Sequence, residues 1–415
     1  MSNRVGLIHV PRLQYRKPRI TEYGIYIDGI QYIGTVSTSS DAWVQDTYAS
    51  LGCPNELLTD NLIFYNAQNE RNATQTRYGK GICCNIAGTL YSDAFSNQTP
   101  YQDNYQSSCL YVKRVQNLEG DFSVTGYFKS FYSGYTVTIS ARQILRLGFP
   151  VGKANEVKYT ESGTAFATSS TTFVDDTYAV LSFEVPTNMI AIIIYNTMGR
   201  ITTSGSSIGI RTCVNINDSD VSQSISQQSW HYDNYPYNCK SIYATTLTAG
   251  SYTIKGRVCS VAGATIRVNY RVLAVILLKP SLFTVYSQYS DVLRTTNSTT
   301  WVNDPDIGLS FSIPSTYLYF VFYNASNRNN DPEYSTGKYI GLEIDGVMPE
   351  ANSLGNSGTA SNYPNSVFTM YSGYLSSGNH TIQPKFKSLD GQNVSIRDRQ
   401  FIVCLMNAML TPYPP

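Results

Sequence analysis

The sequence predicts an all-β protein built from three tandem jelly-roll-like antiparallel β-sandwiches. Three observations lead to this prediction: a set of motifs that recurs three times in register, short apolar runs with strand periodicity, and a charge-poor, tyrosine-rich composition. Charged residues make up 14% of the chain, against about 25% in an average soluble protein. The chain contains 34 tyrosines, which favour strands. No segment has a sustained helical apolar period, so we expect helices to be short or absent.

The first half of the repeat consists of an aromatic residue, a Tyr-Asn pair and a glycine at constant spacing. The Tyr-Asn pair begins 22 positions after the aromatic residue, and the glycine comes 14 positions after the tyrosine. The aromatic residues are Trp43, Phe173 and Trp301, the tyrosines are Tyr65, Tyr195 and Tyr323, and the glycines are Gly79, Gly209 and Gly337. Because no gap is needed, we expect three copies of one unit, with the aromatic residues in the same core position.

Two charged residues also recur in each copy, at fixed distances from the recurring aromatic and glycine residues. An aspartate lies three positions after each aromatic residue, and an arginine lies eight positions after a late glycine of each copy. They are Asp46, Asp176 and Asp304, and Arg142, Arg271 and Arg399. We interpret the aspartates as turn or capping residues at a strand entry. We interpret the arginines as outward-facing residues that bond a neighbouring strand or carboxylate.

The repeat divides the chain into an arm and three sandwiches. Residues 1–34 form a basic, proline-containing arm with a lead-in strand, and the predicted sandwiches span residues 35–150, 158–280 and 290–409. Each copy holds about eight short strands, the size of a jelly roll or of an immunoglobulin-like sandwich. The number of strands does not separate these two topologies.

The sequence predicts neither a membrane span nor a nucleic-acid partner. The longest apolar runs, Met189–Tyr195 and Val272–Leu278, are much shorter than the roughly 20 residues of a membrane helix and are interpreted as buried strands. The first twenty residues contain five basic residues and two prolines, so we expect no Sec-type export signal. The formal net charge of +1 provides no overall field that would attract nucleic acid.

The eight cysteines predict two disulfides. Cys83 and Cys213 each lie four residues after the repeat glycine, and Cys109 and Cys239 each follow 26 residues later. The third copy lacks both cysteines. Because the two cysteines occur together in two copies and are lost together in the third, we predict Cys83–Cys109 and Cys213–Cys239 disulfides. The alternative is that each copy holds two independent buried thiols. Each bond would contribute about 3 kcal/mol and would imply an oxidising setting or the cytoplasm of a hyperthermophile.

Little in the sequence points to catalysis. The three histidines are far apart and do not recur, and there is no Cys-x-x-Cys, so we expect neither a catalytic triad nor a zinc site. One recurring aspartate per copy is not the carboxylate pair of a glycosidase. The oxygen-rich segment Asn329–Glu333 is interpreted as a solvated turn rather than a calcium site. We therefore expect no enzymatic activity, no cofactor and no metal.

An aromatic-rich segment of the second copy is the candidate binding loop. Its side chains could stack on a sugar or contact a partner, or they could pack over the sandwich that carries them. We favour packing. The residues are Trp230, His231, Tyr232, Tyr235 and Tyr237.

The repeated unit resembles jelly-roll proteins of virus particles. The Leu-x-x-Gly-x-x-Thr-Ile turn of Leu247–Ile254 is similar to the penultimate hairpin of trimeric jelly-roll modules in capsid appendages. The strand that begins at Arg271 and the charge-poor composition are similar to turret and vertex proteins of archaeal icosahedral viruses. The resemblance covers all three copies, but its motifs are short and no functional residue carries over.

The resemblance implies a non-catalytic virion component: a turret, vertex or capsid-decorating protein. Its implied partners are other virion proteins and further copies of the chain, with a host glycan or receptor as an additional partner. It would be assembled in the host cytoplasm and located in the virion. The alternative is an adhesin or carbohydrate-binding protein on the extracellular surface, which would normally be exported. From the tandem units we expect a quasi-linear stack of sandwiches.

Overall fold

The computed structural model shows an all-β protein, which confirms the predicted fold class. All regular elements among the described residues are β-strands. None of the described segments forms a helix long and apolar enough to span a membrane. The structure describes residues 25–55, 57–69, 80–92, 96–98, 108–130, 134, 136–201, 208–230, 236–327, 338–349, 354–356 and 366–407.

The strands fall into three consecutive units. Unit 1 contains β1 (Tyr26–Thr38), β2 (Val44–Cys53), β3 (Thr59–Asn69), β4 (Lys80–Ile86), β5 (Thr89–Leu90), β6 (Ser96–Gln98), β7 (Ser108–Leu118), β8 (Phe122–Ser130) and β9 (Val137–Pro150). Unit 2 contains β10 (Glu156–Ser162), β11 (Phe166–Thr168), β12 (Val174–Val185), β13 (Met189–Ile201), β14 (Ile208–Ile216), β15 (Ser219–Trp230), β16 (Pro236–Leu247), β17 (Gly250–Ser260) and β18 (Ile266–Leu278). Unit 3 contains β19 (Phe283–Ser290), β20 (Arg294–Thr296), β21 (Val302–Asn303), β22 (Leu309–Ile313), β23 (Tyr317–Ser326), β24 (Lys338–Ile344), β25 (Leu354–Asn356), β26 (Val367–Leu375), β27 (Gly378–Ser388) and β28 (Val394–Asn407).

Each unit consists of two antiparallel sheets with the same strand order. One sheet, here called axial, has the order β1-β9-β3-β7 in unit 1, β10-β18-β13-β16 in unit 2 and β19-β28-β23-β26 in unit 3. The other, here called peripheral, has the order β2-β8-β4-β5, β12-β17-β14-β15 and β21-β27-β24-β25. Each unit has eight strand positions when β5 and β6, β10 and β11, β19 and β20, and β21 and β22 are each counted as one position. Numbered along the chain, these positions have the order 1-8-3-6 in every axial sheet and 2-7-4-5 in every peripheral sheet. This interleaving of early and late strands is the jelly-roll topology, not the immunoglobulin one.

The residue patterns of the two sheets differ because the sheets are covered differently. In the peripheral strand β17, buried and partly exposed residues alternate from Thr253 to Val258, as expected when one face meets solvent. In the axial strand β18, every residue from Tyr270 to Leu278 is buried. The apolar run Val272–Leu278 thus forms a buried strand, as predicted, because its sheet is covered on both faces.

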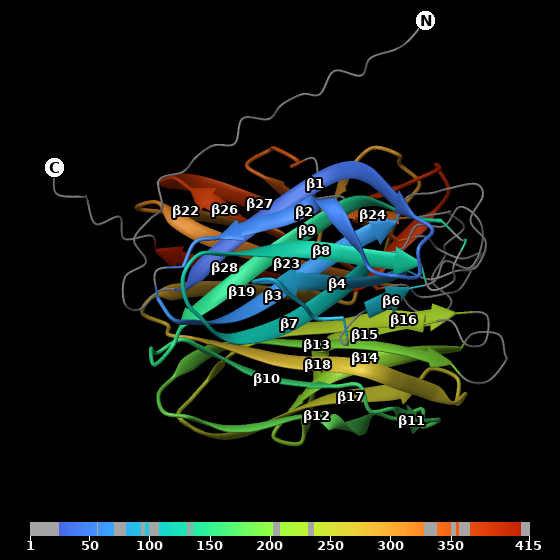
Figure 1. The fold of residues 1–415 in the computed structure, drawn as a ribbon, viewed down its shortest axis with the longest axis horizontal. Helices are drawn as coiled ribbons and strands as arrows, with labels where there is room; N and C mark the ends of the chain where they lie inside the picture. The colour runs from blue at the N-terminus through green and yellow to red at the C-terminus, as the bar shows by residue number, and fades with distance from the viewer. Residues whose placement is uncertain are drawn as a thin grey trace, which may run out of the picture.

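The three units close into a ring, because each unit contacts both of the others. In Figure 1, unit 1 (blue to teal) overlaps unit 3 (orange to red), and unit 2 (green to yellow) lies below them. The asparagine of each Tyr-Asn pair donates its side-chain N–H to a backbone carbonyl of another unit. Unit 1 bonds to unit 3, unit 2 to unit 1, and unit 3 to unit 2, and the three acceptors occupy the same repeat position. The pairs are Asn66 with Phe368 at 2.6 Å, Asn196 with Leu110 at 2.9 Å and Asn324 with Lys240 at 2.9 Å. The expected quasi-linear stack is wrong, because the end units of a row would not touch.

The centre of the ring is a hydrophobic core shared by the three axial sheets. One continuous buried cluster includes Phe64 of unit 1, Ile194 of unit 2 and Phe322 of unit 3, which occupy the same repeat position. The ring centroids of Phe64 and Phe322 are 5.2 Å apart. The interiors of units 2 and 3 form separate clusters. The ring is therefore stabilised by apolar burial at its centre, with the asparagine bonds at the contacts between units.

The recurring aromatic residues do not lie in the sandwich cores. A Cβ atom added to Gly81 would lie 3.0 Å from the Trp43 ring, and the Lys129 ammonium lies 4.8 Å from the centroid of the same ring. Lys387 lies over Trp301 at the same distance. Trp301 likewise lies over Gly341. The prediction of a shared core position is wrong, because Trp43, Phe173 and Trp301 are all only half-buried.

Candidate functional site

Each unit encloses one buried cluster made from three recurring residues of the sequence. The aspartate comes from the second strand position of the unit, the tyrosine from the third and the arginine from the last. We call these the Asp–Tyr–Arg clusters. They are Asp46, Tyr65 and Arg142 in unit 1, Asp176, Tyr195 and Arg271 in unit 2, and Asp304, Tyr323 and Arg399 in unit 3.

The cluster of unit 2 shows how the charges are held. Tyr195 Oη and Arg271 Nε donate to the same oxygen, Asp176 Oδ2, at 2.8 and 2.9 Å. The other carboxylate oxygen accepts the backbone N–H of Tyr178 at 3.2 Å. The side chains of Asp176 and Arg271 are both 0% exposed. A buried ion pair is tolerated only when its members are also hydrogen-bonded, and this one is.

The clusters correct one prediction and refine another. The recurring arginines point inward and are buried, so the outward orientation that we expected is wrong, although their carboxylate partner was anticipated. The aspartates do form strand-entry turns: Asp46 Oδ1 accepts the N–H of Tyr48, two residues on, at 3.1 Å. The clusters are enclosed between the two sheets, where they connect strands that are distant in the sequence.

Unit 3 departs from the pattern at one position. Tyr178 places its ring 5.2 Å from the guanidinium carbon of Arg271 in unit 2, whereas unit 3 has Asp306 there. Arg399 Nη2 donates to Asp306 Oδ2 at 2.5 Å. Burial raises the pKa of Asp304 to about 6 although Arg399 opposes this shift, and the bond from Arg294 lowers the pKa of Asp306 to about 2.

The two predicted disulfides are not formed, because all eight cysteines are free and buried. Thr212 Oγ1 lies 3.3 Å from Cys239 Sγ. Consecutive residues of a strand point to opposite faces, so Cys213 points away from Cys239. It lies opposite Arg257 of β17, which forms an ion pair on the solvent side of the peripheral sheet.

The matching cysteines of unit 1 are also on different sheets. Cys83 lies on β4 of the peripheral sheet and Cys109 on β7 of the axial sheet. Their joint recurrence with Cys213 and Cys239 therefore reflects conserved packing positions within the repeat. Burial raises the pKa of the Cys239 thiol, and the hydrogen bond from Thr212 opposes this shift.

The candidate binding loop lies largely outside the described residues. Trp230 ends β15 opposite Ile208, and Tyr237 lies on β16 opposite Gly199. The remaining members, His231, Tyr232 and Tyr235, fall outside the described residues, as does the segment Asn329–Glu333. In the part of the chain that the structure describes, no group of three or more His, Cys, Asp or Glu residues is arranged to hold a metal ion.

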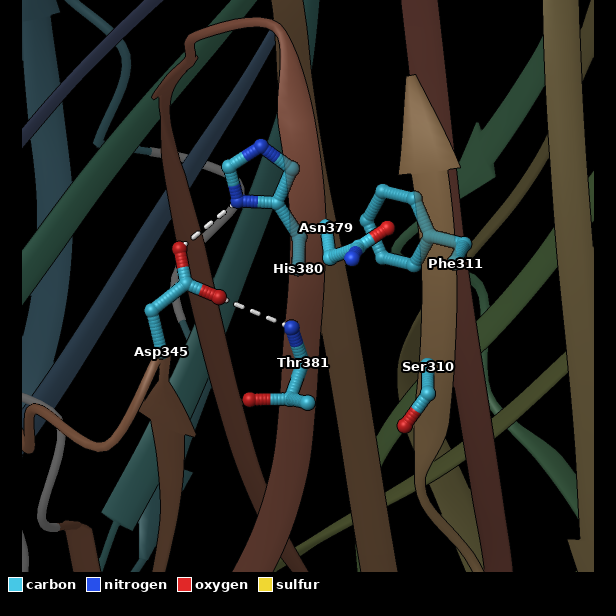
Figure 2. A pocket seen from close by; sticks show the side chains of 6 residues that line it. All are labelled: Ser310, Phe311, Asp345, Asn379, His380 and Thr381. Carbon is cyan, nitrogen blue, oxygen red and sulfur yellow. Dashed lines mark hydrogen bonds and ion pairs between the residues drawn. The ribbon is translucent and has the colours of Figure 1, made fainter.

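A hollow in the peripheral sheet of unit 3 was not anticipated from the sequence (Figure 2). It has a volume of about 660 Å³ and lies where β27 begins, between β22 and the turn after β24. His380 Nδ1 lies 2.7 Å from Asp345 Oδ2, and its Nε2 lies 2.7 Å from the Ser376 carbonyl oxygen. The hollow is lined by Ser310, Phe311, Asp345, Asn379, His380 and Thr381.

No family model matches the chain, and no curated protein is similar to it. Similar solved structures include PNGF-II, at 9% identity over 84% of this chain and 98% of that one, with a TM-score of 0.27. The tandem CBM22 domains of Paenibacillus barcinonensis Xyn10C match at 9% identity over 61% of this chain and 93% of theirs, with a TM-score of 0.19. The Sulfolobus Turreted Icosahedral Virus structure matches at 10% identity over 86% and 82%, with a TM-score of 0.18. At these scores nothing about activity is transferred.

Proposed function

We propose that this chain is a non-catalytic structural component of a virus particle, such as a turret, vertex or capsid-decorating protein. The observation that carries the proposal is the closed ring of three jelly rolls with equivalent contacts at equivalent positions. Jelly rolls are a recurrent architecture of viral capsid proteins. Closed cyclic symmetry is the usual way in which separate copies of a subunit assemble. This chain has the form of such a trimer with its three subunits joined covalently.

The surface of the ring suits a body with several different neighbours. The three peripheral sheets occupy equivalent places but differ in chemistry. Unit 2 carries an ionic network in which Arg257 pairs with Asp175 and Asp220, and Lys255 with Asp175 and Asp218. Units 1 and 3 each carry a lysine over a tryptophan ring, Lys129 over Trp43 and Lys387 over Trp301, where unit 2 has Cys259 and Phe173. A homotrimer would offer three identical faces, whereas this ring offers distinct ones.

The polar groups of the clusters support a structural role over a catalytic one. The charged side chains of the Asp–Tyr–Arg clusters are at most 1% exposed, which leaves almost no surface on which a substrate could react. Their bonds instead join the two sheets of each unit, which is what a rigid shell component needs.

The test is to locate the protein. Particles purified by density gradient from cells that express the chain are analysed by mass spectrometry and by cryo-electron microscopy. We expect the chain in the particle fraction at a fixed ratio to the shell protein, with a ring of three jelly rolls visible in the map. Recovery of the chain only with cell envelopes would contradict the proposal and favour an adhesin.

A further inference from the structure

We propose that the hollow of unit 3 is a saccharide-binding site, in which a sugar packs against Phe311 and bonds a hydroxyl group to Asp345. The inference goes beyond the proposed virion role and rests on separate observations. The hollow has a volume of about 660 Å³, within the roughly 300–1,000 Å³ of most small-molecule sites.

The apolar part of the site is an aromatic ring held in place on two sides. The Phe311 ring centroid is 5.9 Å from that of Tyr286 and 5.9 Å from that of His380. Phe311 is half-buried, so part of its ring remains open to the hollow. A ring that is already fixed loses little conformational freedom when a ligand stacks on it.

The polar part of the site is the Asp345 carboxylate, because Ser310, Asn379 and Thr381 alternate with Phe311 and His380 along their strands and point to the solvent face of the sheet. Figure 2 shows Asp345 on one side of the strand that carries Asn379 and Thr381, with Phe311 and Ser310 on the other. Ser310, Asn379 and Thr381 are exposed, and the Asp345 side chain is 41% exposed. Hydroxyl groups bond strongly to a carboxylate whose geometry is fixed.

The Asp345 carboxylate is fixed by two bonds within the protein. Its Oδ2 lies 2.7 Å from His380 Nδ1, and its Oδ1 accepts the backbone N–H of Thr381 at 2.8 Å. Burial disfavours the charged imidazole, but the bonds to Asp345 and to the Ser376 carbonyl outweigh it and raise the pKa of His380.

The other two units show that the fold does not require this pair. In all three units the backbone N–H at the turn donates to the carbonyl of the same neighbouring strand. The bonds are Asp345 to Thr381 at 2.9 Å, Asn217 to Thr253 at 2.9 Å and Ala87 to Ser123 at 3.0 Å. At the position of His380, units 1 and 2 have Phe122 and Tyr252. The turn thus forms with alanine or asparagine, and the ionisable pair is particular to unit 3.

Saturation-transfer NMR tests the site with the methyl glycosides of glucose, galactose, mannose and N-acetylglucosamine as probes. We expect transfer to at least one of them, lost in Phe311→Ala and reduced in Asp345→Asn. The second variant keeps a side-chain oxygen that can bond Thr381, as Asn217 does for Thr253 in unit 2, so its turn should remain intact. Phe183→Ala, the matching change in unit 2, is the control and should leave the transfer unchanged.

Two results would overturn the inference. One is the absence of transfer to all four glycosides with the folded, unmodified chain. The other is unchanged transfer in Phe311→Ala. Recovery of the variants in purified particles is measured in parallel, so that loss of sugar binding and failure of the virion role are distinguished.

Discussion

Asn196 of the second unit donates its side-chain N–H to the backbone carbonyl of Leu110 in the first unit, over 2.9 Å. Both residues are buried. The same bond joins each of the other two pairs of units, and the bonds therefore mark the pseudo-threefold symmetry of the ring at the level of single atoms.

Replacing Asn196 by alanine should lower the stability of the whole ring. The buried Leu110 carbonyl would lose this donor, which costs about 1–3 kcal/mol. The measurement is chemical unfolding followed by circular dichroism. Asn303→Ala, at an exposed position of β21, is the control and should be close to neutral. Equal midpoints for the two variants would show that the bond contributes nothing.

Replacing Arg271 by methionine should destabilise the chain more strongly. The change leaves the Asp176 carboxylate buried without its ionic partner, and breaking a buried pair in this way costs about 3–5 kcal/mol. The double variant Arg271→Met with Asp176→Asn should recover part of the loss, because no charge then remains buried. The measurement is the denaturant midpoint of unfolding, compared between the single and the double variant. A double variant that is no more stable than the single one would contradict this account.

The repeat could be predicted from the sequence because fixed offsets are visible without any structure. Asp176, Tyr195 and Arg271 were each recognised as recurring residues. Their meeting in one cluster was not predicted, because it depends on pairing between strands about 20 and 95 residues apart, across two sheets. The buried arginine was interpreted as exposed for the same reason, since its partner lies far away in the sequence.

The ring could not be predicted because a repeat specifies the units and not their mutual placement. One signal was nevertheless present. Ile192, Ile193 and Ile194 are consecutive and all buried, so both faces of β13 need cover, and a sandwich covers only one. The hollow was missed for a related reason. His380 does not recur, so the repeat gives it no signal, yet its difference from Phe122 and Tyr252 is what sets unit 3 apart.

The eight cysteines should all be recovered as free thiols. Each is buried, and burial raises the pKa of thiols such as Cys259, to about 11, so they should react slowly in the folded protein. Alkylation followed by mass spectrometry should detect almost no labelling of the native chain and eight labels after unfolding without reductant. If six or fewer cysteines are labelled in the unfolded, unreduced chain, at least one disulfide is present and this prediction is wrong.

The last prediction concerns Lys240, whose burial lowers its pKa to about 8. Its ammonium group contacts the Ser366 carbonyl of unit 3 at 3.5 Å. A lysine in the unfolded chain titrates near pH 10.5, so between pH of about 8 and 10.5 the unfolded chain holds this proton while the folded chain releases it. The free energy of unfolding should therefore rise with pH in this window. Below the window Lys240 is charged in both states, and the folded chain bears the full cost of burying this charge. Unit 1 has Leu110 at the equivalent position, and Lys240→Leu should flatten this rise and increase the melting temperature near pH 7. An unchanged pH profile in Lys240→Leu would show that Lys240 remains charged in the folded ring.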